Sequence, residues 1–245
     1  MSHPWMVRTL PMPLSRQRPV PINLSDPADF YLPHQGLRAL AAASPKNALL
    51  AGRGPPGTHD VPLLSDTLAR VRSLGTDSTN PKVELPIFDK SLHGGQGDRS
   101  KETIAVDGQV DVFILEGWSL GYAAISPETL RQRWKKGKTA SLHPWETMEE
   151  INTNLANFEK AIHPFFDAHI AIQPSSFDHV YRWRLQQEHH MKSLNGGQGM
   201  SDEEVRRFVD RYMPVYECYA EDAHAAPSLT MFFGPDREVE RVDQL

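Results

Sequence analysis

Two stripes of apolar residues run through the chain at helical spacing. One stripe consists of Met148, Ile151, Leu155, Phe158 and Ile162. The other consists of Val61, Leu64, Leu68, Val71 and Leu74. Apolar positions that recur every three to four residues lie on one face of a helix, so each stripe predicts a helix with a buried side. Asp60 precedes the second stripe and is the expected N-cap of its helix.

Further helices are predicted from their capping residues and their composition. Ser126 is followed by Pro127, which suits the first position of a helix. Ser201 and Glu204 have the spacing of a capping box. The segments 36–44 (GLRALAAAS) and 177–192 (FDHVYRWRLQQEHHMK) are also expected to be helical.

Four short segments predict strands between these helices: 83–90 (VELPIFDK), 109–117 (QVDVFILEG), 169–172 (HIAI) and 229–233 (LTMFF). The segment at 109–117 has a nearly continuous apolar run, which is typical of a strand covered on both faces of a parallel sheet. Strands that alternate with helices predict an α/β fold with a mostly parallel sheet.

Composition narrows the function classes. The 245 residues carry a formal charge of −5, which gives no reason to expect nucleic acid or an anionic membrane as partner. The single cysteine excludes an internal disulfide and a cysteine-rich zinc site and favours a reducing, cytoplasmic location. The Arg-bearing, Pro-rich start leaves mitochondrial targeting as the alternative location. The expected organisation is an extension at 1–25 and one domain at 26–245.

Two nucleotide-binding patterns occur in the wrong context. Residues 52–57 (GRGPPG) match G-x-G-x-x-G, but no strand precedes them and two prolines occupy the place where a helix would begin. Residues 137–139 (GKT) follow a predicted helix, and the P-loop pattern requires glycine where Gln132 stands. We interpret both segments as loops.

Several segments together resemble the D-glycerate 3-kinase family. These are DFYLPH (29–34), NALLAGRGPPGTHD (47–60), LPIFDKSLHGGQGDR (85–99), VFILEGW (112–118), VYRWRLQQE (180–188) and GMSDEEVRRFVDRYMPVY (199–216). The resemblance implies a parallel-sheet P-loop kinase fold, with ATP and Mg²⁺ as cofactors. It also implies phosphoryl transfer to a hydroxyl of a small acid or pathway intermediate, which relies on positioning and charge stabilisation.

The same resemblance implies roles for particular residues. Glu116 would help to hold Mg²⁺ directly or through water, and Asp29, the second of the family's two acids before Phe-Tyr, is the other expected catalytic residue. His59, Asp60, Lys90 and Arg99 would face the substrate. Arg182 and Arg184 lie on the helix that forms a lid over the phosphates in related kinases, and Arg184 is the preferred contact because the two side chains face different sides.

The sequence departs from the family pattern at two places. Residues 1–245 contain no G-x-x-x-x-G-K-[ST] motif, and Ala28 stands where relatives carry the first of two acids before Phe-Tyr. The resemblance implies that this first acid is the general base for the substrate hydroxyl. Asp26 lies close by in sequence, and whether it could take over this role is left open. One explanation is a truncated gene prediction of an active kinase. The other is a degenerate kinase homologue that acts as a binding or accessory protein, with apolar surface exposed where the central strand and its helix are missing.

Overall fold

The structure, a computed structural model, describes residues 22–74, 82–108, 110–223 and 228–244. The strands are β1 (Ile22–Ser25), β2 (Lys82–Asp89), β3 (Asp98–Asp107), β4 (Val112–Leu115), β5 (His169–Pro174), β6 (Ser228–Phe233) and β7 (Val239–Gln244). The α-helices are α1 (His34–Ala43), α2 (Val61–Ser73), α3 (Leu92–Gly95), α4 (Pro127–Lys136), α5 (Trp145–Ile162), α6 (Asp178–Leu194), α7 (Asp202–Asp210) and α8 (Met213–Tyr219). Short 3-10 helices are η1 (Pro27–Phe30), η2 (Ala48–Leu50), η3 (Ala140–Leu142), η4 (His163–Phe165) and η5 (Ala220–Asp222).

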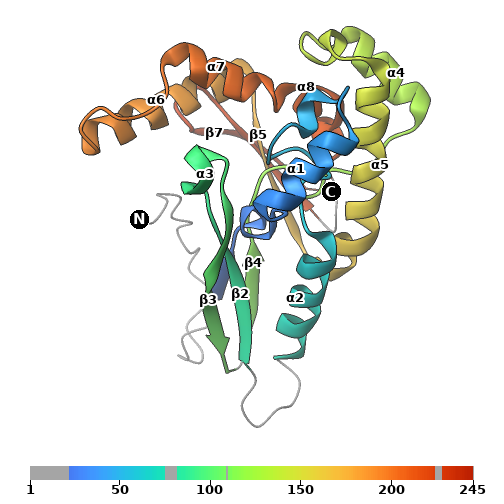
Figure 1. Cartoon of the computed structure of the whole chain (residues 1–245). Helices are drawn as coiled ribbons and strands as arrows, with labels where there is room; N and C mark the ends of the chain where they lie inside the picture. The colour runs from blue at the N-terminus through green and yellow to red at the C-terminus, as the bar shows by residue number, and fades with distance from the viewer. Residues whose placement is uncertain (1–21, 75–81, 109, 224–227, 245) are drawn as a thin grey trace.

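The strands form three small sheets. β1 pairs in parallel with β4, and β5 pairs in parallel with β6, which carries β7 antiparallel on its other edge. β2 and β3 form a separate antiparallel hairpin that extends beside β4 in Figure 1. The parallel pairs agree with the predicted α/β class, whereas the strands β1, β3 and β7 were not predicted.

Helix α5 connects the two parallel pairs through one buried face. The predicted stripe is confirmed, since all five of its residues are buried in α5. Leu155 shares a core cluster with Ala171 of β5, whereas Phe158 packs in a cluster with Phe113 of β4. Figure 1 shows α5 and α2 on the same side of the molecule, with β4 beside α2. The two parallel pairs therefore lie against the same helical layer.

The opposite face of β4 and of β5 is apolar and open to solvent in the described part of the chain. Val112 and Ile114 of β4 are 41% and 38% exposed, and Ile170 and Ile172 of β5 are 62% and 65% exposed. Side chains alternate across a strand, so these residues point away from the helical layer that covers Phe113 and Ala171. The prediction that the β4 segment is covered on both faces is wrong for the described residues, because one face has no partner there.

The predicted helix caps are present. Asp60 accepts a hydrogen bond from the backbone of Leu63 at 3.2 Å, and Ser126 accepts one from Thr129 at 3.1 Å. Ser201 and Glu204 form the predicted capping box of α7. The apolar pattern that continues beyond α7 is divided between α7 and α8, with Pro214 in the first turn of α8.

The described fold begins earlier than the expected domain boundary. Ile22–Ser25 forms strand β1 in the sheet, although the sequence pattern placed these residues in the Pro-rich extension. The rest of that extension, residues 1–21, lies outside the described residues. Among the helices that the structure describes, none combines the length and the apolar character that a membrane span requires.

Candidate active site

Two acidic residues lie side by side where the parallel strands β1 and β4 end. Ser25 pairs with Leu115 in the register of the two strands, and the backbone of Glu116 donates to the carbonyl of Ser25 at 2.9 Å. Asp26 and Glu116 are therefore the first residues beyond the same sheet edge. Ligands of open α/β sheets bind outside the carboxyl ends of the strands, so this pair marks the candidate active site.

Gly117 allows the close approach of the two strand ends. A Cβ at this position would lie 2.7 Å from Cδ of Pro27 and 3.6 Å from Oδ1 of Asp26. Real side chains do not tolerate the first of these distances, so the backbone after Glu116 packs directly on the start of η1. The glycine in the ILEG segment is thus required by the packing that brings the two acids together.

Asp26 and Asp29 connect the strand end to the β2–β3 hairpin. Asp26 caps η1 by accepting a hydrogen bond from Ala28 at 2.8 Å, and its other oxygen lies 3.6 Å from Nζ of Lys90. Asp29 accepts a hydrogen bond from the backbone of Phe88 at 3.0 Å. Burial raises the pKa of Asp29 above its ordinary value, and the Phe88 N–H partly offsets this effect.

Arg99 joins the hairpin to the start of α2. Its guanidinium donates to Oδ2 of Asp60 at 3.0 Å and to the carbonyl of Tyr31 at 2.9 Å. The side chains of Arg99 and Asp60 are both 24% exposed, so this ion pair lies below the surface. A partly buried guanidinium with further N–H groups is suited to grip a carboxylate or a phosphate.

His59 lies behind these groups and is not open to solvent. It is 8% exposed, and its ring packs on Tyr31 with centroids 4.6 Å apart. Its Nδ1 is buried without a hydrogen-bond partner among the described residues. Burial lowers the pKa of His59 to about 4, so the ring is neutral at physiological pH. In this conformation His59 supports Tyr31 and does not reach the solvent-facing side of the site.

The loop at 52–57 is held by side chains from elsewhere in the chain. The Thr58 hydroxyl accepts from the backbone of Gly54 at 3.0 Å and donates to the carbonyl of Pro55 at 2.8 Å. Nε1 of Trp118 donates to the carbonyl of Gly54 at 3.1 Å. The structure thus confirms that this segment is a loop, and it brings Trp118 beside it.

The two arginines of α6 have different partners. Arg182 forms an exposed ion pair with Asp236 at 2.7 Å. Arg184 lies 2.7 Å from Oε2 of Glu188, whose side chain is only 1% exposed, and its guanidinium carbon is 5.3 Å from the ring centroid of Phe208. Arg184 therefore faces the inner side of α6, and Arg182 faces the turn between β6 and β7. The predicted contact of Arg184 with the phosphates stays a prediction.

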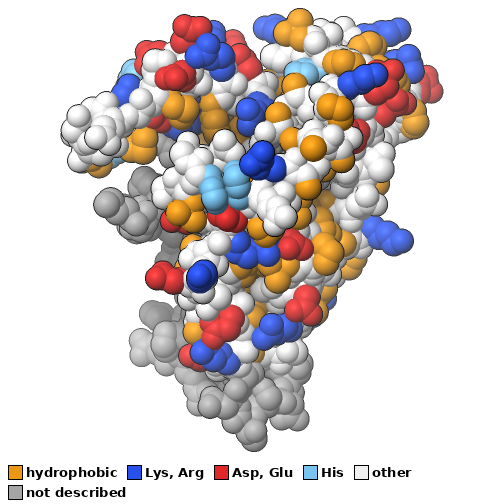
Figure 2. All heavy atoms as spheres, in the orientation of Figure 1, with side chains coloured by type: hydrophobic (Ala, Val, Ile, Leu, Met, Phe, Trp, Pro, Cys, Tyr) orange, Lys and Arg blue, Asp and Glu red, His pale blue; other side chains and the backbone are white. Residues whose placement is uncertain are grey.

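The predicted residues fall into two groups. Asp29, Lys90, Arg99 and Asp60 lie around the strand end that carries Glu116, whereas Arg182 and Arg184 lie on α6. Figure 2 shows acidic and basic side chains interspersed on the face of the molecule in view. No described group of three or more His, Cys, Asp or Glu residues is arranged to hold a metal ion. A cation here would take an oxygen ligand from Glu116 and complete its shell with water and phosphate, as Mg²⁺ usually does.

Comparisons with known proteins show to which family the chain belongs. No protein-family model matches the chain. The D-glycerate 3-kinase of Cryptococcus neoformans has a solved structure that superposes with a TM-score of 0.87 and 38% sequence identity, over 92% of this chain and 80% of that one. The chain belongs to the D-glycerate 3-kinase family. Its fold is accordingly the P-loop kinase-like α/β fold that the resemblance implied.

Two curated members of the family extend the comparison. The chloroplastic D-glycerate 3-kinase of Arabidopsis thaliana is 35% identical over 199 residues, which are 80% of this chain and 41% of the plant protein. The Saccharomyces cerevisiae protein named "Probable ATP-dependent kinase TDA10" is 37% identical over 204 residues, which are 82% of this chain and 67% of the yeast protein. The chain therefore spans less than half of the plant kinase and about two thirds of the yeast one.

Asp26, Trp118 and Glu188 were not among the predicted site residues. Asp26 could have been found by aligning the ends of two strands, but the four-residue strand β1 was hidden in a Pro-rich segment. Trp118 stood in the recognised VFILEGW segment without an assigned role. Glu188 gave no sequence signal, because a glutamate in a polar helix is most often exposed.

Proposed function

We propose that this protein is an ATP-dependent kinase that transfers a phosphoryl group to a hydroxyl of a small acid, with D-glycerate as the first acceptor to test. The observation that carries the proposal is the pairing of the strand ends at Asp26 and Glu116, with Lys90 of the hairpin 3.6 Å from Asp26 and Arg99 paired with Asp60. Carboxylates on one side suit a divalent cation, and cations on the other suit an anionic acceptor.

In this proposal each residue of the chain has a distinct task. Glu116 is exposed and would orient Mg²⁺ directly or through water, while Lys90 and Arg99 would hold the carboxylate of the acceptor. Arg184 would close over the phosphates of ATP from α6. Bound Mg·ATP supplies the phosphoryl group and neutralises charge on its oxygens.

Asp26 and Asp29 are the two candidates for the general base. The acceptor oxygen would bond to the γ-phosphorus while its proton moves to one of these carboxylates. The bond between the γ-phosphorus and the bridging oxygen breaks, and ADP leaves with that electron pair. Asp26 is favoured by its half-exposed side chain beside the backbone of Glu116, and Asp29 by its raised pKa, which makes its carboxylate a stronger base than an ordinary aspartate. Replacing each by Asn and comparing the pH dependence of kcat separates the two.

The test is a coupled ADP-release assay with D-glycerate, ATP and Mg²⁺, confirmed by detecting the phosphorylated product. We expect Glu116→Gln to lower kcat by about 10²-fold, in line with the loss of one electrostatic contact to the transition state. Glu128→Gln is the matched control, because Glu128 is also exposed but lies in the first turn of α4. Full activity of Glu116→Gln would remove Glu116 from the proposed mechanism.

A second candidate function is a binding or accessory role without catalysis. It is favoured by the open apolar face of β4 and β5 in the described part of the chain, which suits a protein partner. Titration of the 245-residue chain with Mg·ATP distinguishes the two roles. Saturable binding with turnover supports the kinase, and a folded chain that binds no Mg·ATP supports the accessory role.

A further inference from the structure

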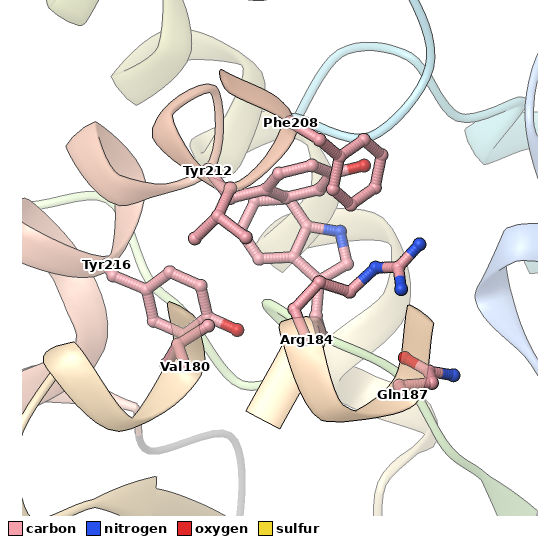
Figure 3. A pocket seen from close by; sticks show the side chains of 8 residues that line it. Val180, Arg184, Gln187, Phe208, Tyr212 and Tyr216 are labelled. Carbon is pink, nitrogen blue, oxygen red and sulfur yellow. The ribbon is translucent and has the colours of Figure 1, made fainter. Parts of the chain in front are cut away.

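A cavity of about 290 Å³ lies between α6, α7, α8 and the segment that follows β4. Its lining residues are Trp118, Val180, Arg184, Gln187, Phe208, Val209, Tyr212 and Tyr216. Figure 3 shows these side chains coming from different elements, with the ends of Arg184 and Gln187 on the side away from Tyr216. The volume is close to the lower end of small-molecule pockets, at about 300 Å³. None of the roles proposed above uses this space, apart from that of Arg184.

Flat aromatic faces dominate the walls of this cavity. Trp118 and Tyr212 contact each other at a centroid distance of 4.7 Å and an interplanar angle of 74°. Phe208 lies 5.1 Å from Tyr212, and Val180 of α6 belongs to the same lining. Ring edges and faces favour a planar occupant, which gains stacking energy in addition to burial.

Two polar side chains of the lining have free hydrogen-bonding capacity within the described residues. No described group pairs with the hydroxyl of Tyr216 or the side-chain amide of Gln187. The Tyr216 hydroxyl points toward the middle of the lining residues in Figure 3. Both groups can donate and accept, so they suit the edge of a ring that carries nitrogen or oxygen atoms. Burial raises the pKa of Tyr216 to about 12, so its hydroxyl keeps its proton.

Arg184 provides positive charge at the same cavity. One of its terminal nitrogens pairs with Glu188, while the side chain remains 22% exposed. The other oxygen of Glu188 accepts a hydrogen bond from the backbone of Met200 at 2.7 Å, which fixes the carboxylate and with it the guanidinium. A guanidinium has five N–H donors, so several remain available for an anionic group of a ligand.

The cavity is close to the proposed catalytic centre. Trp118 follows Glu116 by two residues, which separates their Cα atoms by at most about 7 Å. A ligand seated on Trp118 can therefore extend toward the carboxylates at the ends of β1 and β4. We propose that this cavity binds a planar heteroaromatic ring of an anionic ligand, with the ring on Trp118 and Tyr212 and the anionic group at Arg184.

The ring has two sources, the base of the donor nucleotide or a ring on the phosphoryl acceptor. The inference rests on the proposed function only for its location beside Glu116. Ring binding needs no phosphoryl transfer and is measured without Mg²⁺. A chain that fails as a kinase but binds a ring would refute the proposed function and leave the ring site in place.

The test is isothermal titration calorimetry with three probes: AMP, indole-3-lactate and D-glycerate. We expect AMP or indole-3-lactate to bind with a Kd below about 1 mM, which corresponds to roughly −4 kcal/mol, and D-glycerate to show no binding at this site. Binding of AMP alone assigns the ring to the donor, and binding of indole-3-lactate alone assigns it to the acceptor. Failure of both ring-bearing probes to bind overturns the proposal.

Variants localise the binding. Val180→Phe fills the cavity and is expected to raise the Kd of the bound probe at least tenfold. Met191→Phe, on the exposed side of α6, is expected to leave this Kd unchanged. Tyr216→Phe keeps the aromatic ring and removes the hydroxyl, and we expect it to raise the Kd of the probe threefold to tenfold. Circular dichroism confirms that each variant is folded. Unchanged affinity in both Val180→Phe and Tyr216→Phe would place the ring elsewhere and overturn the proposal.

Discussion

The guanidinium of Arg99 donates to the carboxylate of Asp60 at 3.0 Å and so ties the β2–β3 hairpin to the first turn of α2. Asp60 also caps α2 through the backbone of Leu63. One carboxylate therefore serves a helix terminus and an ion pair at once. Arg99 consequently has both a structural and a proposed substrate-binding role, and the two roles can be separated by experiment.

Arg99→Ala is expected to lower the free energy of unfolding by about 1–2 kcal/mol, because the partly buried Asp60 loses its partner. Urea denaturation measures this change. Arg72→Ala is the matched control, since Arg72 pairs with Asp167 at the surface, and its loss should cost less than about 1 kcal/mol. If Arg99→Ala also leaves both KM and kcat for the acceptor unchanged, the proposed substrate contact is wrong.

The neutral, buried His59 makes stability depend on pH. Its pKa of about 4 in the folded protein is below the value of about 6.5 expected after unfolding. Between these values the unfolded chain binds a proton that the folded chain does not, so stability increases with pH across this window and is lost as the pH falls from about 6.5 to about 4.

From pH 7.5 to pH 5 the free energy of unfolding should decrease less in His59→Phe than in the unaltered protein. We expect the two decreases to differ by about 2 kcal/mol. Phenylalanine retains the stacking on Tyr31 and cannot take up a proton. Urea midpoints at the two pH values provide the measurement, and His190→Phe on the exposed side of α6 serves as control. Parallel pH profiles of His59→Phe and the unaltered protein would contradict the assigned burial.

Gly117→Ala is expected to destabilise the protein by about 1–3 kcal/mol, as overpacking does elsewhere, because the added methyl group meets the ring of Pro27. It should also lower kcat by moving Glu116 away from Asp26. Gly36→Ala is a suitable comparison, because Gly36 lies within α1, where alanine favours the helix and the nearest atom is 3.3 Å away at Leu32. Equal thermal stabilities of the two variants would show that the strand ends are not tightly packed.

Ile172→Ala is expected to change the free energy of unfolding by no more than about 0.5 kcal/mol, because Ile172 is largely exposed in the described structure. Ile151→Ala, in the buried stripe of α5, should cost about 2–5 kcal/mol. A large loss of stability in Ile172→Ala would mean that another surface covers this face in solution.

The elements that the sequence predicted well are those whose signals are local. The stripe of α5 and the caps Asp60 and Ser126 depend on neighbours within a turn or two, and all are present in the structure. Strand β3 was missed because its residues are mostly polar and exposed, so it lacks the apolar alternation of a half-buried strand. It forms by pairing with β2, and this partner cannot be read from its own composition.

The candidate site was predicted in part for a related reason. The family motifs marked Glu116, Lys90 and Arg99, and the structure brings their segments together around the ends of β1 and β4. The role of Asp26 as the neighbour of Glu116 depends on the register of two strands that are far apart in sequence. The partners of Arg184 and the aromatic cavity depend on how α6, α7 and α8 pack, which no single segment encodes.

The β2–β3 hairpin and its turn carry Lys90 and Arg99, the two cations proposed to hold the acceptor. The acids Asp26 and Glu116, in contrast, follow the ends of strands β1 and β4. Recognition and chemistry are thus carried by separable pieces of the chain. A hairpin can change the identity and reach of its turn residues without repacking the layer of α2 and α5. Substitutions in the hairpin alone can therefore change which acceptor a relative prefers, while the groups at the ends of β1 and β4 keep their geometry.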